Sequence, residues 1–135
     1  MQVDKVSIVT ACYNSYETLY RCWESLKNQT YGIENLECIF VDDASTDEGK
    51  TLSILYEIEK EAPDNVIVIA SDNNMGPGGA LNLGISYATG LYLQILDSDD
   101  ELSEDAIEKL HSIAVEYNTD IIQYNHTLIM GIRAG

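Results

Sequence analysis

The sequence predicts an α/β fold, with a mainly parallel β-sheet covered by helices on both faces. Short, β-branched apolar segments alternate with segments whose apolar residues recur every three or four positions, the pattern of strands followed by amphipathic helices. At 135 residues and 45% hydrophobic content, the chain is large enough to bury one core. We therefore expect a single domain over residues 1–135.

Four helices are expected between five strands. Asn14 should cap the first helix, because Glu17 follows at the capping-box spacing. The second helix should stop at Pro63, and Ser103 should cap the fourth, whose buried face should include Tyr117. The expected strands cover residues 6–12, 36–41, 65–70, 91–96 and 120–124, and the glycine-rich segment 76–79 should open the third helix, which runs to about residue 88.

Acidic residues follow two of the expected strands. Asp42 and Asp43 close the second strand, and Asp97, Asp99 and Asp100 follow the fourth. The carboxyl ends of parallel strands form the edge at which open α/β sheets bind ligands. Carboxylates this close repel one another unless a cation lies among them, and Mg²⁺ or Mn²⁺ takes such oxygen ligands. The alternative is that the last two acids only precede and cap the next helix.

Other residues near these strand ends have a binding and a structural interpretation. Asp43 could accept hydrogen bonds from a base or a ribose, or it could stabilise a turn. Tyr13 could lie beside a planar base, or it could pack in the core. The two cysteines inside expected strands, Cys12 and Cys38, are expected to be buried, reduced thiols, and both histidines, His111 and His126, are expected to be incidental.

The formal net charge of −16 argues against nucleic-acid binding, which needs a basic surface. None of the seven Lys and Arg residues falls in the acidic clusters or the glycine-rich segment. If the ligand carries phosphates, a metal ion and helix N-termini must therefore balance most of their charge. No apolar run approaches the ~20 residues of a membrane span, and the N-terminus is not typical of a secretory signal. A cytoplasmic protein is expected.

Taken together, the motifs resemble the nucleotide-sugar-binding half of family 2 glycosyltransferases. The resemblance runs from Val6 to about Leu110 and implies the Rossmann-like GT-A fold. The matching segments are 7–14 (SIVTACYN), 25–31 (SLKNQTY), 41–47 (VDDASTD), 74–78 (NMGPG), 80–84 (ALNLG) and 96–100 (LDSDD). The implied nucleotide-sugar-binding residues are Ala11, Tyr13, Asn14, Asp43, Gly78, Asn82, Asp97 and Ser98, and the implied metal ligands are Asp97, Asp99 and Asp100.

The resemblance implies transfer of a sugar from a nucleoside diphosphate to an acceptor hydroxyl, with inversion. A UDP-sugar is the expected donor, and a glycan, a lipid-linked sugar or a protein is the expected acceptor, as in polysaccharide biosynthesis. Leu81 stands where relatives often carry Arg. The family's general base lies beyond the matched region, so residues 1–135 are expected to be a truncated catalytic domain without the acceptor-binding part, and the full-length protein to work at the inner face of the membrane.

The sequence leaves two alternative interpretations. A non-catalytic module could keep the same nucleotide-sugar site without turnover. A phosphoacceptor receiver domain also combines parallel strands with clustered aspartates and Mg²⁺, but it places its acidic pair after the first strand and a lysine after the last. Here Cys12-Tyr13-Asn14 follows the first strand, which disfavours receivers and also haloacid-dehalogenase-type phosphatases.

Overall fold

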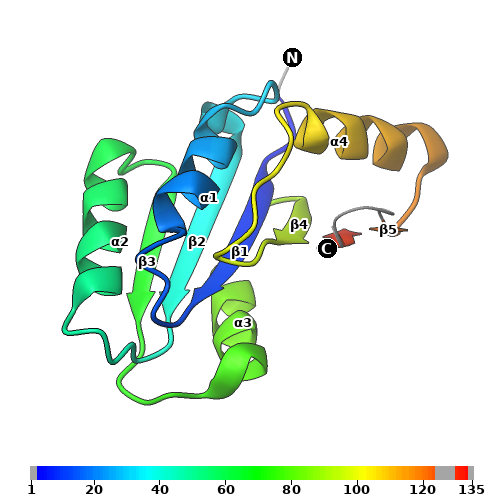
Figure 1. Cartoon of the computed structure of the whole chain (residues 1–135). Coiled ribbons are helices and arrows are strands. Elements are labelled where there is room, and N and C mark those ends of the chain that lie inside the picture. The colour runs from blue at the N-terminus through cyan, green and yellow to red at the C-terminus, as the bar shows by residue number, and fades with distance from the viewer. Residues whose placement is uncertain (1–2, 124–129, 134–135) are drawn as a thin grey trace.

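A six-stranded β-sheet organises the computed structural model, which describes residues 3–123 and 130–133 (Figure 1). Four strands are parallel, and helices cover both faces, so the predicted fold class is confirmed. The elements in chain order are β1 (Val6–Cys12), α1 (Leu19–Lys27), η1 (Ile33–Asn35), β2 (Leu36–Asp42), α2 (Lys50–Glu61), β3 (Val66–Ala70), α3 (Gly76–Tyr87), β4 (Tyr92–Ile95), α4 (Ala106–Tyr117), β5 (Ile121–Gln123) and β6 (Met130–Arg133).

The strand order is β3-β2-β1-β4-β6-β5. The chain moves outward from β1 to β2 and β3, then crosses back to place β4 on the other side of β1. The expected fifth strand is present as β5, but it pairs antiparallel with β6, which was not predicted. β6 also pairs antiparallel with β4. Tyr124, the expected end of the fifth strand, lies outside the described residues.

The side chains of the central strands alternate between two apolar clusters because successive residues of a strand face opposite sides of a sheet. Ile8 and Phe40 belong to the cluster under α1, α2 and α4. Val9 and Ile39 belong to the cluster under α3. A Cβ on Gly84 of α3 would lie only 2.5 Å from Cγ1 of Val9. This glycine therefore lets the helix backbone lie directly on the sheet.

Two predicted helix starts are wrong. Helix α1 has Thr18 as its N-cap, not Asn14, and Asn14 takes a left-handed backbone with φ 49°. Helix α4 has Asp105 as its N-cap, and the carbonyl of Ser103 accepts the amide of Ala106. Tyr117, expected on the buried face of α4, is 67% exposed. Asn14 does not cap the helix because its side chain hydrogen-bonds to Thr46 in the β2–α2 loop.

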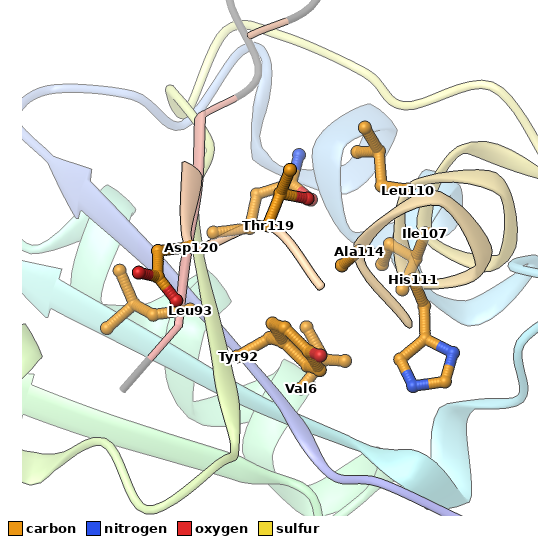
Figure 2. A pocket seen from close by; sticks show the side chains of 10 residues that line it. Val6, Tyr92, Leu93, Ile107, Leu110, His111, Ala114, Thr119 and Asp120 are labelled. Atoms are coloured by element: carbon orange, nitrogen blue, oxygen red, sulfur yellow. The ribbon is translucent and has the colours of Figure 1, made fainter. Parts of the chain in front are cut away.

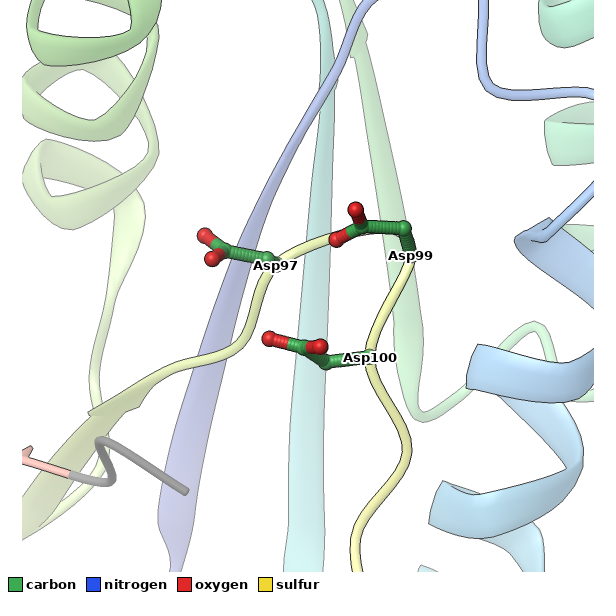
Figure 3. Close-up of side chains that lie close together, drawn as sticks. All are labelled: Asp97, Asp99 and Asp100. Atoms are coloured by element: carbon green, nitrogen blue, oxygen red, sulfur yellow. The ribbon is translucent and has the colours of Figure 1, made fainter. Parts of the chain in front are cut away.

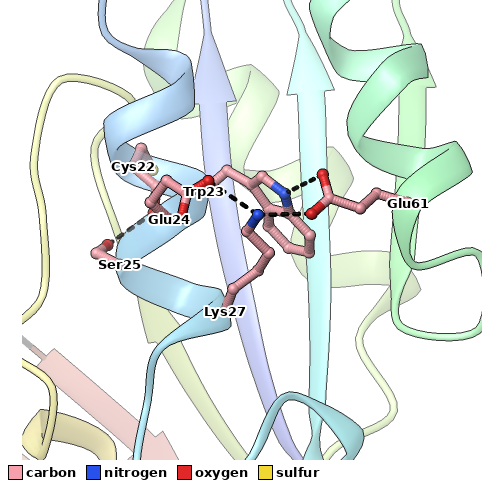
Figure 4. Close-up of polar contacts among 6 residues, drawn as sticks. All are labelled: Cys22, Trp23, Glu24, Ser25, Lys27 and Glu61. Atoms are coloured by element: carbon pink, nitrogen blue, oxygen red, sulfur yellow. Dashed lines mark hydrogen bonds and ion pairs between the residues drawn. The ribbon is translucent and has the colours of Figure 1, made fainter.

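Polar contacts join the helices on the α1 side of the sheet (Figure 4). The indole of Trp23 donates a hydrogen bond to Glu61 at 3.1 Å, which connects α1 to α2. Lys27 forms ion pairs with Glu24 at 2.8 Å and with Glu61 at 2.5 Å. Because these carboxylates are about half exposed, such pairs contribute little individually. The buried body of Trp23 supplies most of the stabilisation.

At the amino ends of the parallel strands, Glu37 of β2 holds β1 and the α3–β4 connection by hydrogen bonds. Its carboxylate accepts hydrogen bonds from the hydroxyl of Ser7 and from the amide and hydroxyl of Thr89, each at 2.8 Å. Burial alone would raise the pKa of Glu37, but these three hydrogen bonds outweigh it and the net pKa is lowered. The amide of Gly90 donates to the Ser7 hydroxyl. The α3–β4 connection is thus held against β1 and β2.

Cys12 and Cys38 are buried free thiols, as expected, and so is Cys22 on α1. Burial raises the pKa of the Cys22 thiol to about 12, with a smaller contribution from the carboxylates of Asp100, Asp99, Asp97 and Glu101. Such thiols are neutral and unreactive in the native protein. Within the described residues, no helix combines the length and the apolar character needed to cross a membrane.

Candidate functional site

The candidate site lies where the carboxyl ends of β1, β2 and β4 meet. β2 and β4 flank β1 on opposite sides, so the strand order reverses at this point of the sheet. Open α/β sheets bind their ligands in the crevice formed at such a reversal. The ends of β2 and β4 carry the acidic residues singled out in the sequence, and the loop after β1 carries Tyr13 and Asn14.

The loop after β4 gathers three carboxylates (Figure 3). Each of Asp97, Asp99 and Asp100 offers an oxygen, and these three oxygens lie within 4.8 Å of one another. Asp97 and Asp99 are exposed and Asp100 is half-buried. The amide of Asp100 donates to the carbonyl of Asp97 at 3.0 Å, which closes a turn. The predicted clustering of these acids is present, and they lie well before α4, so they do not cap it.

The electrostatics of this loop favour a cation. Burial raises the pKa of Asp100, and the neighbouring charges of Asp99 and Asp97 raise it further. No Lys or Arg is among the described residues that line the two adjoining clefts, so the side chains lining them supply no compensating positive charge. Three converging carboxylate oxygens fit the donor set of a hard divalent cation such as Mg²⁺ or Mn²⁺.

Two buried carboxylates lie at the carboxyl end of β2. Asp42 and Asp43 are only 4% and 3% exposed. Asp42 accepts the hydroxyl of Ser45, which is a turn role. Asp43 Oδ1 accepts the amide of Met75 at 2.7 Å, and the Asp43 carbonyl accepts the side-chain amide of Asn74 at 3.1 Å. Asp43 therefore fixes the start of α3 while it lines a cleft.

The loop after β1 carries Tyr13 and Asn14. Tyr13 is 48% exposed, so the alternative of core packing is excluded. The Asn14 side chain exchanges two hydrogen bonds with Thr46: its Nδ2 donates to Thr46 Oγ1 at 3.1 Å, and its Oδ1 accepts the Thr46 amide at 2.8 Å. The Asn14 amide donates to the Ser45 hydroxyl at 2.9 Å. These contacts with the β2–α2 loop explain why Asn14 does not cap α1.

Two open clefts share a wall at this edge of the sheet. The larger, of about 510 Å³, is bounded on one side by the acidic loop, and the smaller, of about 220 Å³, contains Asp43. Ala11, Tyr13 and Pro77 line both. The larger cleft is also lined by Asn14, Ser15, Tyr16, Glu17, Thr18, Leu81, Asp97, Ser98 and Asp99, and the smaller also by Cys12, Asn74 and Gly76.

Most of the expected binding residues are thus brought together. Asp100 belongs to the acidic cluster but lines neither cleft, and Gly78 and Asn82 are outside both linings although they lie on α3 beside Pro77 and Leu81. Sequence reasoning missed Ser15 and Thr18. The only available signal was the concentration of hydroxyl residues between β1 and α1.

A different cavity lies at the amino ends of β1 and β4 (Figure 2). It has a volume of about 30 Å³ and is lined mainly by apolar side chains, including Val6 and Leu110. His111 borders it, packs at a tilt against the ring of Tyr31 and edge-to-face against the ring of Tyr92, and contacts Asp4 at 2.8 Å. This histidine is distant from the acidic loop and packs structurally, as expected. His126 lies outside the described residues.

Comparisons with known proteins identify a family for this chain. The family model for Glycosyl transferase family 2 matches residues 7–132. A poly(ribitol-phosphate) beta-glucosyltransferase of Bacillus spizizenii is 38% identical over 117 residues, which cover 87% of this chain and 18% of the relative. The chain therefore spans only about a fifth of that relative's length.

Solved structures show the same fold. S. aureus TarS 1-349 in complex with UDP-GlcNAc aligns with a TM-score of 0.80 and 28% identity, covering 88% of this chain and 33% of that one. A mannosyltransferase of Pyrobaculum calidifontis, in complex with GDP-Man and Mn²⁺, aligns with a TM-score of 0.83 at 18% identity, covering 98% of this chain and 45% of that one. This second likeness bears on the fold alone. By the family model that spans nearly its whole length, the chain belongs to glycosyl transferase family 2.

Proposed function

We propose that this chain binds a nucleoside-diphosphate sugar in the joined clefts, with Mg²⁺ or Mn²⁺ held by Asp97, Asp99 and Asp100. The observation that carries the proposal is the convergence of three carboxylate oxygens within 4.8 Å beside a cleft whose described lining includes no Lys or Arg. The carboxylates repel one another, and a diphosphate would add further negative charge. A divalent cation offsets both, and its preferred ligands are carboxylate and phosphate oxygens.

The two clefts suggest how the donor lies. The smaller, with Asp43 beside Ala11 and Tyr13, suits the nucleoside, because a buried carboxylate can accept hydrogen bonds from a base and an exposed ring can stack on it. The larger, with Ser98 and the acidic loop, suits the diphosphate. Asn14 would contact the donor in the larger cleft, which it lines, while Gly78 and Asn82 would approach the donor from α3. A UDP-sugar is the expected donor, and the TarS complex with UDP-GlcNAc supports that class.

The proposed reaction of the longer protein is a single displacement with inversion. The acceptor oxygen forms a bond to the anomeric carbon while the bond from that carbon to the diphosphate oxygen breaks. The electron pair leaves with the nucleoside diphosphate, and the acceptor proton passes to a general base. When bound, the divalent cation would supply charge stabilisation to the departing diphosphate. The acceptor is a glycan, a lipid-linked sugar or a protein, and polysaccharide biosynthesis is the proposed role.

We place the general base outside these residues. The relatives are several times longer than this chain, and it covers 18% of one and 33% of another. Residues 1–135 would then be the donor-binding part of a larger catalytic domain. Without a positioned base the transfer rate should fall by roughly 10²–10⁴-fold. Full-rate transfer by residues 1–135 alone would contradict this assignment.

Thermal unfolding with UDP, GDP and dTDP, each with and without Mn²⁺, tests the binding proposal. We expect one nucleotide to raise the midpoint only when Mn²⁺ is present, and Asp99→Ala to abolish that shift. Stabilisation that is independent of the metal, or that survives in Asp99→Ala, would contradict the proposed site. The non-catalytic alternative is tested separately, by measuring sugar transfer in the longer protein.

A further inference from the structure

The residue between two of the clustered carboxylates is held from outside its own loop. Ser98 separates Asp97 from Asp99, and its carbonyl accepts the hydroxyl of Thr18 at 2.9 Å. Its hydroxyl is 2.8 Å from the hydroxyl of Ser15. Because both the backbone and the side chain of Ser98 are fixed, the directions in which its two acidic neighbours leave the chain are restricted.

Thr18 forgoes the usual role of a residue in its position. It is the N-cap of α1, where a threonine normally accepts an amide hydrogen of the first helical turn. Here the N-cap makes no side-chain capping hydrogen bond. The hydroxyl has one hydrogen and lies nearer to the Ser98 carbonyl, at 2.9 Å, than to the Ser15 carbonyl, at 3.3 Å. Its contact to a residue 80 positions away is the one that the geometry favours.

Ser15 is anchored in turn by the start of α2. Its amide donates to the hydroxyl of Thr51 at 2.9 Å. Thr51 is fully buried, and its own hydroxyl donates to Asp47. A chain of hydrogen bonds therefore runs from Asp47 through Thr51 and Ser15 to Ser98. The β1–α1 loop is fastened to the β2–α2 loop on one side and to the acidic loop on the other.

We propose that Thr18 and Ser15 are positioning residues for the acidic loop. The inference rests on the proposed function, since it concerns the readiness of Asp97 and Asp99 to receive the cation. The three carboxylates repel one another when no cation is bound, and that repulsion favours an open loop. The two contacts to Ser98 oppose the opening and keep the oxygens convergent. Loss of a group that orients metal ligands typically lowers metal affinity by about 10–100-fold.

The test compares Thr18→Val, which keeps the side-chain shape without the hydroxyl, with Thr18→Ser, which keeps the hydroxyl. Mn²⁺ binding in the absence of nucleotide is measured by electron paramagnetic resonance, and amide hydrogen exchange is followed over residues 97–101. Thr18→Val should weaken Mn²⁺ binding about tenfold and speed exchange in that loop. Thr18→Ser should match the wild type in both Mn²⁺ affinity and the exchange rate of that loop. Ser15→Ala should weaken binding in the same direction.

The matched control is Thr30→Val, which removes an exposed threonine hydroxyl that donates to Glu108, away from the clefts. It should leave Mn²⁺ affinity and loop exchange unchanged. If Thr18→Val binds Mn²⁺ like the wild type, or Thr18→Ser is as weak as Thr18→Val, the positioning role is wrong while the proposed function stands. If the wild type itself binds no Mn²⁺ without nucleotide, the acidic loop is not held ready for the cation and the positioning role is wrong, whereas the proposed function is judged by the unfolding experiment with nucleotide.

Discussion

Asp100→Asn should stabilise the metal-free protein and at the same time weaken its response to a divalent cation. Asp100 is half-buried beside two like charges, and burial together with Asp99 and Asp97 raises its pKa. The ionised carboxylate is therefore unfavourable at neutral pH in the folded chain. A neutral amide of the same shape removes the repulsion, but it also removes one of the three charges available to a metal.

The size of the effect follows from the geometry. At 4.8 Å, the upper limit of the separation between the converging oxygens, two carboxylates repel by about 0.9 kcal/mol in water and about 3.5 kcal/mol at an effective dielectric constant of about 20. Asp97 and Asp99 are exposed, so the value near that of water applies, and salt screens it further. A net gain of about 1 kcal/mol for Asp100→Asn corresponds to a rise of roughly 3–5 °C in the melting temperature of a chain of this size.

Thermal unfolding of the wild type and the variant, with a chelator and with excess Mn²⁺, measures both effects. The matched control is Asp64→Asn, because Asp64 is exposed in the turn between α2 and β3 and its replacement changes the net charge equally. In chelator, Asp100→Asn should have a higher melting temperature than both the wild type and Asp64→Asn. With excess Mn²⁺, its melting temperature should rise by less than theirs. A variant that melts lower than the wild type without metal would refute the reasoning, as would an undiminished response to Mn²⁺.

Three further predictions concern stability and reactivity. Gly84→Ala should lower the free energy of unfolding by about 1–3 kcal/mol in urea, because the new Cβ would lie 2.5 Å from Cγ1 of Val9. In the control Gly78→Ala the new Cβ has nothing within 4 Å, so stability should stay unchanged or rise. An equal loss of stability in Gly78→Ala would contradict the packing explanation. Glu37→Gln should cost about 1 kcal/mol at neutral pH, because the lowered pKa of Glu37 means that its ionised form stabilises the fold above the unfolded pKa. That difference should shrink as the pH falls through the lowered pKa, and a pH-independent difference would argue against it. Cys22, with its pKa raised to about 12, should resist a thiol reagent until denaturant is added, and so should the other two thiols; rapid labelling in native buffer would show that the α1 face opens.

Much of the site could be predicted because its signals are local. Asp43 and Asp97 follow buried apolar strands, and parallel strands bring their carboxyl ends to one edge. The direction of a strand and the position of an acid just after it are both readable in sequence. The acidic cluster beside a cleft is therefore close to what the pattern indicates.

The errors arise where distant segments meet. Asn14 and Glu17 have the spacing of a capping box, but Asn14 bonds to Thr46 on another loop, and α1 begins at Leu19. Likewise, nothing in the sequence indicates that the hydroxyl of Thr18 bonds to the carbonyl of Ser98. Strand β6 was missed because four residues that include a glycine have little strand character by themselves. Its evidence is the pairing with β4 and β5.

The position of β6 has a consequence for shortened versions of this protein. β4 hydrogen-bonds to β1 on one side and to Met130–Arg133 on the other. A fragment that stops before Met130 would leave β4 at the rim of the sheet with unpaired amides and carbonyls. Exposed rims of this kind recruit further chains and promote aggregation. Poor behaviour of such a fragment in solution would then report a missing neighbour strand, and would say nothing about the aspartates that follow β4.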